Sequence, residues 1–145
     1  MPYTIQEGTL PSPALSYKAG LDRSLNVIHI ELKNIGPAQI VISRDQLQGA
    51  ETLAQSVQRQ LSTLERQVKR FVKHREGTLT IGPKAWPAIA VYTEFTQNKL
   101  TAFQAQVAAQ TDASNVLVFT LSTSAALDKE TLQQWLDCVA QFKAS

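Results

Sequence analysis

Residues that carry covalent or metal chemistry are scarce in this chain. Its single cysteine, Cys138, excludes an intramolecular disulfide. Its two histidines, His29 and His74, have no cysteine or histidine partner at the spacing of a metal site. Glycine-rich phosphate-binding loops of the GxxxxGKS/T or GxGxxG type are absent as well. We therefore expect no catalytic residue, no metal and no cofactor, and the sequence predicts a protein that is not an enzyme.

An excess of one charge and long apolar runs are also lacking. The 14 basic and 12 acidic residues leave a net charge of +2, which argues against a nucleic-acid partner. The basic run from Arg66 to Arg75 is flanked by Glu65 and Glu76, which favours a solvated helix end over a phosphate site. No stretch approaches the roughly 18 apolar residues of a transmembrane helix. The first residues also lack the pattern of a signal peptide. We therefore expect a cytoplasmic protein with no stable membrane insertion.

The chain is long and apolar enough for one domain with its own core. It has 145 residues, 43% of them hydrophobic, and neither a linker nor an internal repeat interrupts residues 1–145. β-branched and alternating segments, separated by turn residues, predict seven short strands. A turn at Asn34 to Pro37 indicates a hairpin between the second and third of them. The predicted strands cover residues 3–9, 25–32, 39–43, 78–81, 88–95, 101–108 and 115–121.

Two stretches with apolar residues at helical spacing predict helices. The second begins at Asp128 as its N-cap and carries Trp135 and the half-buried or buried Cys138. The first is long, is stopped by Gly77, and ends in the basic residues around His74. Strands, one long central helix, strands and a C-terminal helix predict an α+β fold with an antiparallel sheet. The apolar positions of the first helix are Leu53, Val57, Leu61, Leu64, Val68, Phe71 and Val72.

Several glutamines fall on or beside apolar faces of these elements. Gln60 lies between Val57 and Leu64 on the predicted helix, and Gln104 and Gln106 share one face of a predicted strand. A buried amide costs free energy unless it is hydrogen-bonded. The residues alone leave two interpretations open. Either the domain's own backbone or water satisfies these amides, which is the usual arrangement, or some of them bind a guest polypeptide.

A set of short motifs, in a fixed order along nearly the whole chain, resembles the DcrB-like family and specifically its Eag branch. The chain departs from that pattern at Ala88, where glycine is expected after Trp-Pro, and at Val57, where an aromatic residue is common. The motifs are Tyr3-x-x-x-Glu7-Gly8, Asp22-Arg23-Ser24-Leu25-Asn26-Val27, Ile42-Ser43-Arg44-Asp45, Glu51-Thr52-Leu53, Arg59-Gln60-Leu61-x-x-Leu64, Phe71, Trp86-Pro87, Phe103-Gln104-Ala105-Gln106, Val118-Phe119-Thr120-Leu121-Ser122 and Trp135.

The resemblance implies a single DcrB-like domain with a PsbP-like fold. Eag proteins are chaperones that accompany type VI secretion effectors. The resemblance implies a small cytosolic homodimer with a concave apolar groove. This groove would shield the N-terminal transmembrane helices of a PAAR-containing effector before the effector is loaded on the secretion spike. The alternative is a non-catalytic interaction or assembly module of the same fold with another partner, because one fold hosts many functions.

The resemblance also implies which residues line the groove. Gln60 and Gln104 match the positions of the family's groove glutamines. Helical spacing from Gln60 and strand alternation then add apolar neighbours to these two positions. The full set of predicted groove residues is Gln60, Leu64, Val68, Gln104, Leu25, Val27, Val41 and Leu100.

Overall fold

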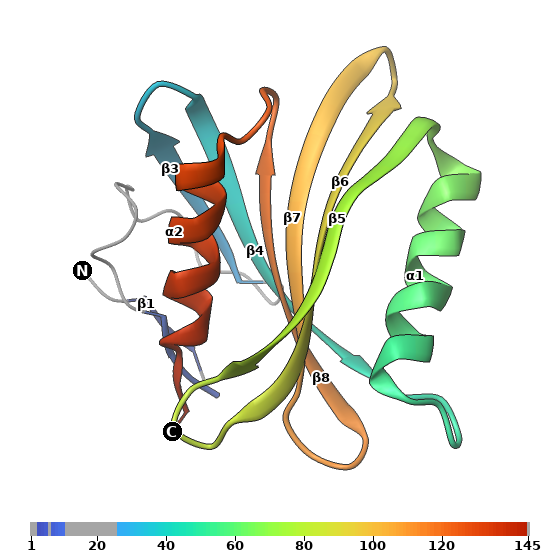
Figure 1. Ribbon diagram of the computed structural model, residues 1–145, viewed down its shortest axis with the longest axis vertical. Coiled ribbons are helices and arrows are strands. Elements are labelled where there is room, and N and C mark those ends of the chain that lie inside the picture. The colour runs from blue at the N-terminus through green and yellow to red at the C-terminus, as the bar shows by residue number, and fades with distance from the viewer. Residues whose placement is uncertain (1–2, 6, 11–25, 145) are drawn as a thin grey trace.

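A computed structural model describes residues 3–5, 7–10 and 26–144 of the chain. Over these residues the fold is α+β, with a six-stranded antiparallel sheet and two helices (Figure 1). This confirms the predicted fold class and the antiparallel sheet. The strand order in the large sheet is β3-β4-β8-β7-β6-β5. Its strands are β3 (Val27–Leu32), β4 (Gly36–Gln46), β5 (Lys69–Ile81), β6 (Trp86–Gln97), β7 (Leu100–Gln110) and β8 (Asn115–Thr123).

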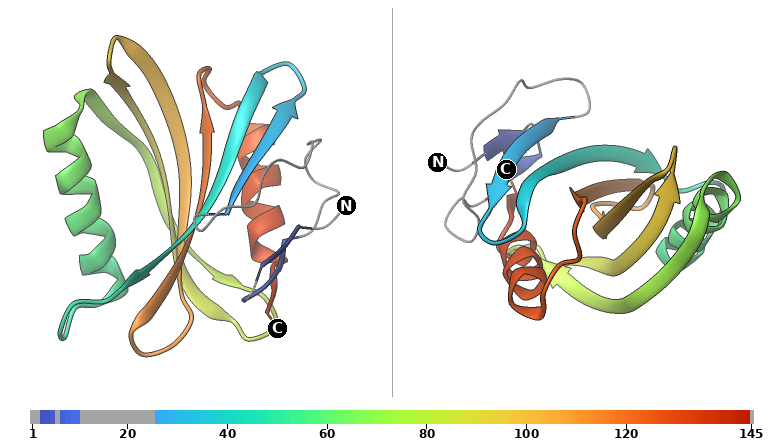
Figure 2. Two further views of the ribbon diagram at one scale, coloured as in Figure 1. Left: turned by 180° about the vertical axis from the view of Figure 1, so that it is seen from behind. Right: turned by 90° about the horizontal axis from the view of Figure 1, so that it is seen from above.

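The two helices, α1 (Leu53–Gln67) and α2 (Lys129–Ala140), lie on opposite sides of this sheet (Figures 1 and 2). A smaller sheet joins the two ends of the described chain. It consists of β1 (Tyr3–Ile5), β2 (Gly8–Leu10) and β9 (Lys143–Ala144), with β2 in the middle. Neither helix is long and apolar enough to cross a membrane.

The face of the sheet on the α2 side carries the larger of the two apolar cores. In one register row Ile42, Phe119 and Val107 lie side by side on β4, β8 and β7, and all three are fully buried. Trp135 and Val139 of α2 belong to the same core. The indole Nε1 of Trp135 donates a hydrogen bond to the backbone oxygen of Ala105 at 3.1 Å, so this large side chain is held in one orientation. Asp128 caps α2 as predicted, because its carboxylate accepts from the Thr131 N–H at 2.7 Å.

The opposite face is apolar only where α1 lies on it. Leu53, Val57 and Leu61 are the buried leucine and valine side chains of α1, and they share a second, smaller core with residues of β6, β7 and β8. Thr52 and Gln55 form a reciprocal capping box that fixes where the helix begins. The sheet residues of this core are Val91, Ala108, Val116 and Val118.

The prediction that the first helix continues past residue 67 is wrong. Val68 is its extended C-cap, with its N–H bonded to the Leu64 oxygen at 3.1 Å, and β5 begins at Lys69. β5 pairs with β6 over most of its length, but the register shifts between Lys69 and Val72 and again between Lys73 and Arg75. Each irregularity breaks the period of two, so the apolar positions imitate a helical spacing.

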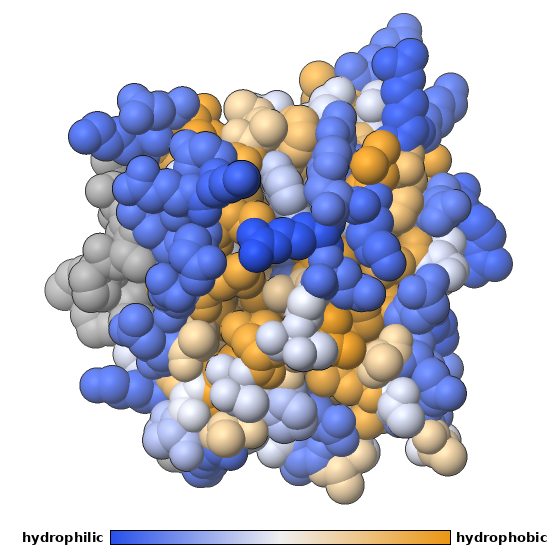
Figure 3. Space-filling view, in the orientation of Figure 1, coloured by the Kyte–Doolittle hydropathy of each residue, from blue (hydrophilic) through white to orange (hydrophobic). Residues whose placement is uncertain are grey.

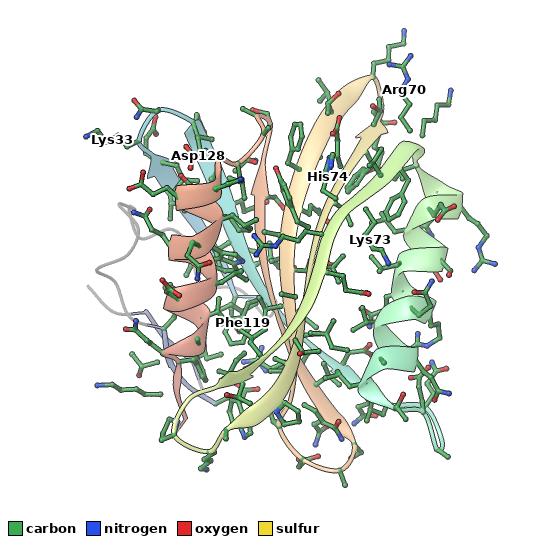
Figure 4. The ribbon with its side chains drawn as sticks, viewed as in Figure 1. Lys33, Arg70, Lys73, His74, Phe119 and Asp128 are labelled. Carbon is green, nitrogen blue, oxygen red and sulfur yellow. The ribbon has the colours of Figure 1, made fainter. Side chains whose placement is uncertain are left out.

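His74 and the basic residues beside it therefore lie on an edge strand and not at a helix end. The His74 Nε2 atom is 2.8 Å from Glu94 Oε1, and its ring lies 5.5 Å from that of Tyr92. Figure 4 shows His74 on the side of β5 toward α2 and Lys73 on the side toward α1. Charged side chains along an exposed edge strand hinder its pairing with another chain, which is a more important role here than any effect on a helix dipole.

The remaining strand predictions are confirmed with different limits. β3 and β4 form the expected hairpin, and the predicted strand at residues 78–81 is the final part of β5. The first predicted strand, residues 3–9, contains two short strands, β1 and β2, that pair with each other. The predicted groove residue Leu25 lies outside the described residues.

We expect Trp135→Phe to lower the free energy of unfolding by about 1–3 kcal/mol, because it removes a buried hydrogen bond and leaves a void. Urea denaturation at neutral pH measures the loss. Trp86→Phe is the matched control, since Trp86 makes no side-chain hydrogen bond within the described residues. Equal losses for the two variants would mean that the Trp135 hydrogen bond contributes nothing.

Candidate functional site

Part of the α1 side of the sheet is not covered by the helix, and it forms a mostly polar surface. Strand pairing aligns its residues in two rows across the sheet. The first row consists of His29, Gln39, Ser122 and Gln104, and the second of Val27, Val41, Thr120 and Gln106. We call this surface the open face, and its residues are Val27, His29, Gln39, Val41, Gln104, Gln106, Thr120 and Ser122.

The open face offers neutral hydrogen-bonding groups beside aliphatic side chains. Val27 and Val41 are half-buried, and amides, hydroxyls and one imidazole surround them. Thr120 accepts a hydrogen bond from Gln106 Nε2 at 3.4 Å. An amide both donates and accepts without a charge to desolvate. The surface can therefore bind a polypeptide that is largely apolar and has a few polar groups.

Gln60 projects from α1 but is engaged within the domain. Its Nε2 donates to Asp45 Oδ2, an atom that also lies 3.8 Å from Arg59 Nη2. Asp45 is the last residue of β4 on the α1 side of the sheet, so this contact connects the middle of the helix to that strand. The Gln60 amide oxygen has no hydrogen-bond donor among the residues the structure describes. The role of Gln60 in a groove stays a prediction, and only its oxygen is available for it.

Gln104 differs from Gln60 in having no partner for its side-chain amide within the described part of the chain. It lies at one end of the first row of the open face, between Ser122 on β8 and Thr93 on β6, and is half-buried. Its backbone oxygen accepts weakly from the Thr93 hydroxyl at 3.5 Å, whereas the amide group itself makes no hydrogen bond there. A half-buried amide in this state retains its full capacity to bind a ligand.

Of the other predicted groove residues, some belong to the open face and others lie outside it. Val27 and Val41 belong to it, as predicted from strand alternation. Leu64 is half-buried on α1, and Val68 caps that helix in an extended conformation, so it does not follow Gln60 on one helical face. Leu100 begins β7 and is 72% exposed at the hairpin with β6. The open-face residues His29, Gln39, Thr120 and Ser122 were not predicted as groove residues. Thr120 is itself buried, whereas the other three alternate with buried residues on their strands.

The residues with reactive side chains lie apart from one another. Burial raises the pKa of the Cys138 thiol to about 11, which confirms a buried cysteine that holds its proton. His29 is exposed on the open face, whereas His74 lies on β5 toward the other face. Within residues 3–5, 7–10 and 26–144, no three His, Cys, Asp or Glu side chains are grouped as metal ligands.

Many of the motif residues make contacts that hold the fold together. Arg44 of β4 bonds both carboxylate oxygens of Glu7, at 2.6 Å from Nη2 to Oε1, and donates from Nη1 to the buried Asn26 at 2.7 Å. Arg44 therefore links the N-terminal strands to the large sheet. Its hydrogen bond holds the pKa of Glu7 below the ordinary value of 4.5. Similarly, Arg59 Nε donates to Glu51 Oε2 at 2.9 Å, which lowers the pKa of Glu51 and secures the start of α1.

Comparison with known proteins finds one family and several solved structures. The family model DcrB matches residues 7–141. A crystal structure of PA94, a protein of unknown function from Pseudomonas aeruginosa, superposes with a TM-score of 0.61 at 27% identity, covering 85% of this chain and 81% of that one. LpqN of Mycobacterium tuberculosis, a protein involved in cell envelope biogenesis, superposes with a TM-score of 0.56 at 20% identity, covering 100% and 90%. No curated protein matches the sequence.

We expect Glu7→Gln to lower the free energy of unfolding by about 0.2–1 kcal/mol at pH 7, because it removes an ion pair that is partly exposed. The folded state lowers the pKa of Glu7, so this contribution is present above pH 4.5 and disappears as the pH falls through the folded value. Urea unfolding of both proteins between pH 7 and 3 measures it.

The exposed α1 residue Glu65 provides the control, since it has no ion-pair partner within the described chain. Glu65→Gln should change the free energy of unfolding at pH 7 by less than Glu7→Gln does. A constant difference between wild type and Glu7→Gln across the whole pH range would contradict the role of Arg44 in lowering that pKa.

Proposed function

Because the chain belongs to the DcrB family, we propose that it is a non-catalytic accessory protein, and more specifically an Eag-type chaperone. In this proposal it shields the apolar N-terminal transmembrane helices of a type VI secretion effector with a PAAR domain. It holds them until the effector is loaded on the secretion spike. The family match supports an accessory role, and the motifs in the sequence support the Eag branch.

The observation that carries the proposal is the amide of Gln104. The motif residues around it are used inside the domain: Ala105 accepts from Trp135, and Gln106 donates to Thr120. Gln104, in contrast, has no side-chain partner within the described residues and lies on the open face beside Ser122. The side chain of Gln104 contributes no hydrogen bond to the described part of the fold. A hydrogen bond from this amide to a guest would explain why glutamine occupies this motif position.

The composition of the open face fits a transmembrane helix as the guest. About 20 apolar residues cannot stay uncovered in water. Val27, Val41 and Leu64 offer aliphatic surface, worth about 25 cal/mol per Å² buried. The amides of Gln104 and Gln39 can satisfy polar groups of the guest, as in recognition of an amphipathic helix in a groove. Charged groups such as Asp45, Lys73 and Glu76 lie at the margins, where a guest need not desolvate them.

Several finer features belong to the same proposal. The protein acts in the cytoplasm as a homodimer, so two open faces can enclose guest helices from two sides. The fold is PsbP-like, and no cofactor takes part. The likeness to LpqN contributes the fold alone, because the two sequences are 20% identical.

The test is co-expression with the N-terminal segment of a PAAR-type effector that is encoded beside this gene. We expect the segment to be soluble and to copurify only when this chain is present. Gln104→Leu keeps the side-chain size but removes the amide, and should weaken binding about twofold to tenfold. Leu64→Asp places a charge against the guest and should abolish copurification.

Gln134→Leu provides the control, because Gln134 is an exposed glutamine on α2, on the other side of the sheet. It should bind as wild type does, and circular dichroism should show all three variants folded. A segment that is equally soluble without this chain would exclude the chaperone function. Wild-type binding by both Gln104→Leu and Leu64→Asp would exclude the open face and favour an interaction module with another partner.

A further inference from the structure

A cavity of about 320 Å³ lies on the other face of the sheet, between α2 and the strands β5 and β6, of which β5 is the edge strand. Figure 3 shows apolar surface exposed in this hollow, beside the hydrophilic side chains of β5. Leu79, Leu132 and Leu136 line its walls, and it is distinct from the open face because it lies on the α2 side. Its volume is at the lower end of the range of about 300–1,000 Å³ that is common for small-molecule sites.

Small residues leave this space unfilled. Gly77 pairs with Ala90 across β5 and β6, and Ala105 and Ala140 complete the floor and the helix side. A Cβ atom at Gly77 would have no atom within 4 Å, and the backbone there is not in the left-handed region. The backbone of β5 therefore does not require glycine at this position. A larger side chain would fit the strand and would fill the cavity.

Arg75 lies at the rim of the cavity and has no acidic partner among the residues that the structure describes. Arg75 is in register with Tyr92 of β6, which pairs with Ala105 of β7, so its side chain is on the α2 face. No carboxylate of the described residues lies within ion-pair distance of its guanidinium group. On the helix side of the rim, Asp137 accepts a hydrogen bond from Gln133 Nε2 at 2.8 Å.

We propose that this cavity binds a small amphiphile with a single carboxylate, such as a fatty acid of medium chain length. The acyl chain lies between the leucines of α2 and Leu79, and the carboxylate pairs with Arg75. A guanidinium group matches a carboxylate with two parallel hydrogen bonds. Asp137 on the other rim repels a second anionic group, which restricts the ligand to one negative charge.

Titration of the full chain with decanoate, below the concentration at which it forms micelles, tests the site. Amide chemical shifts should change mainly in α2 and β5, and calorimetry should give a saturable isotherm. Decanol has the same chain without the charge and should bind at least tenfold more weakly. Arg75→Gln should weaken decanoate binding by about tenfold, the loss expected for one charge-assisted contact. Gly77→Leu should abolish it.

Lys73→Gln is the matched control. Lys73 lies two residues from Arg75 on the same strand but pairs with Thr93 on the α1 face, so the variant loses the same charge away from the cavity. Its decanoate affinity should stay within twofold of wild type. Equal losses for Lys73→Gln and Arg75→Gln would reveal nonspecific charge attraction and overturn the proposal. Wild-type binding by a folded Gly77→Leu, or no saturable binding at all, would also overturn it.

Discussion

The structure depends on one constraint: two helices, of 15 and 12 residues, must protect both faces of a six-stranded sheet. They cannot cover all of it. α2 and the small terminal sheet complete the larger core on one side, whereas α1 covers only the part of the other side where Val91, Ala108 and Val118 are apolar. Beyond this part, the α1-side positions of β4, β7 and β8 in the open face are amides and hydroxyls except for Val41. The open face is therefore a direct result of partial coverage, and its polarity keeps an uncovered sheet stable in water.

Most of the fold was predictable because alternation and capping are local signals. The residues alternating along β3, the turn before Gly36, and the N-cap Asp128 each predict their element from a few neighbouring residues. The end of α1 was not predictable in this way. Lys69 to Arg75 contain two register shifts and a positive φ at Arg70, and these positions become strand only through pairing with β6. That pairing depends on tertiary structure, which no local window contains.

The candidate site was predictable only in part, for a related reason. Strand alternation correctly placed Gln104 and Gln106 on one face of the sheet. The β3–β4 hairpin places Val27 opposite Val41. Partners across the sheet and from helix to strand are not local, however. The bond between Gln60 and Asp45 joins residues 15 positions apart, and the rows that add Ser122 and Gln39 exist only after β4 pairs with β8. The motifs were recognisable in the sequence. The side-chain contacts in the folded chain were needed to tell which motif residues stabilise the fold and which remain available to a ligand.

The direct passage from α1 into β5 determines how the open face can change its width. Only Val68 separates the last helical residue from the first residue of the strand, so the C-terminal end of α1 cannot move without peeling β5 from β6. The start of the helix follows β4 through a short connection. Two contacts reach from this connection and from the end of β4 to the middle of the helix: Glu51 accepts from Arg59, and Asp45 accepts from Gln60. The C-terminal end of α1 is thus fixed by the backbone of β5, whereas the rest of the helix is held to β4 only by side-chain contacts and packing. In the function proposed above, a guest that needs more room would displace the start of α1 by breaking the contacts of Asp45 and Glu51, which leaves the large sheet intact.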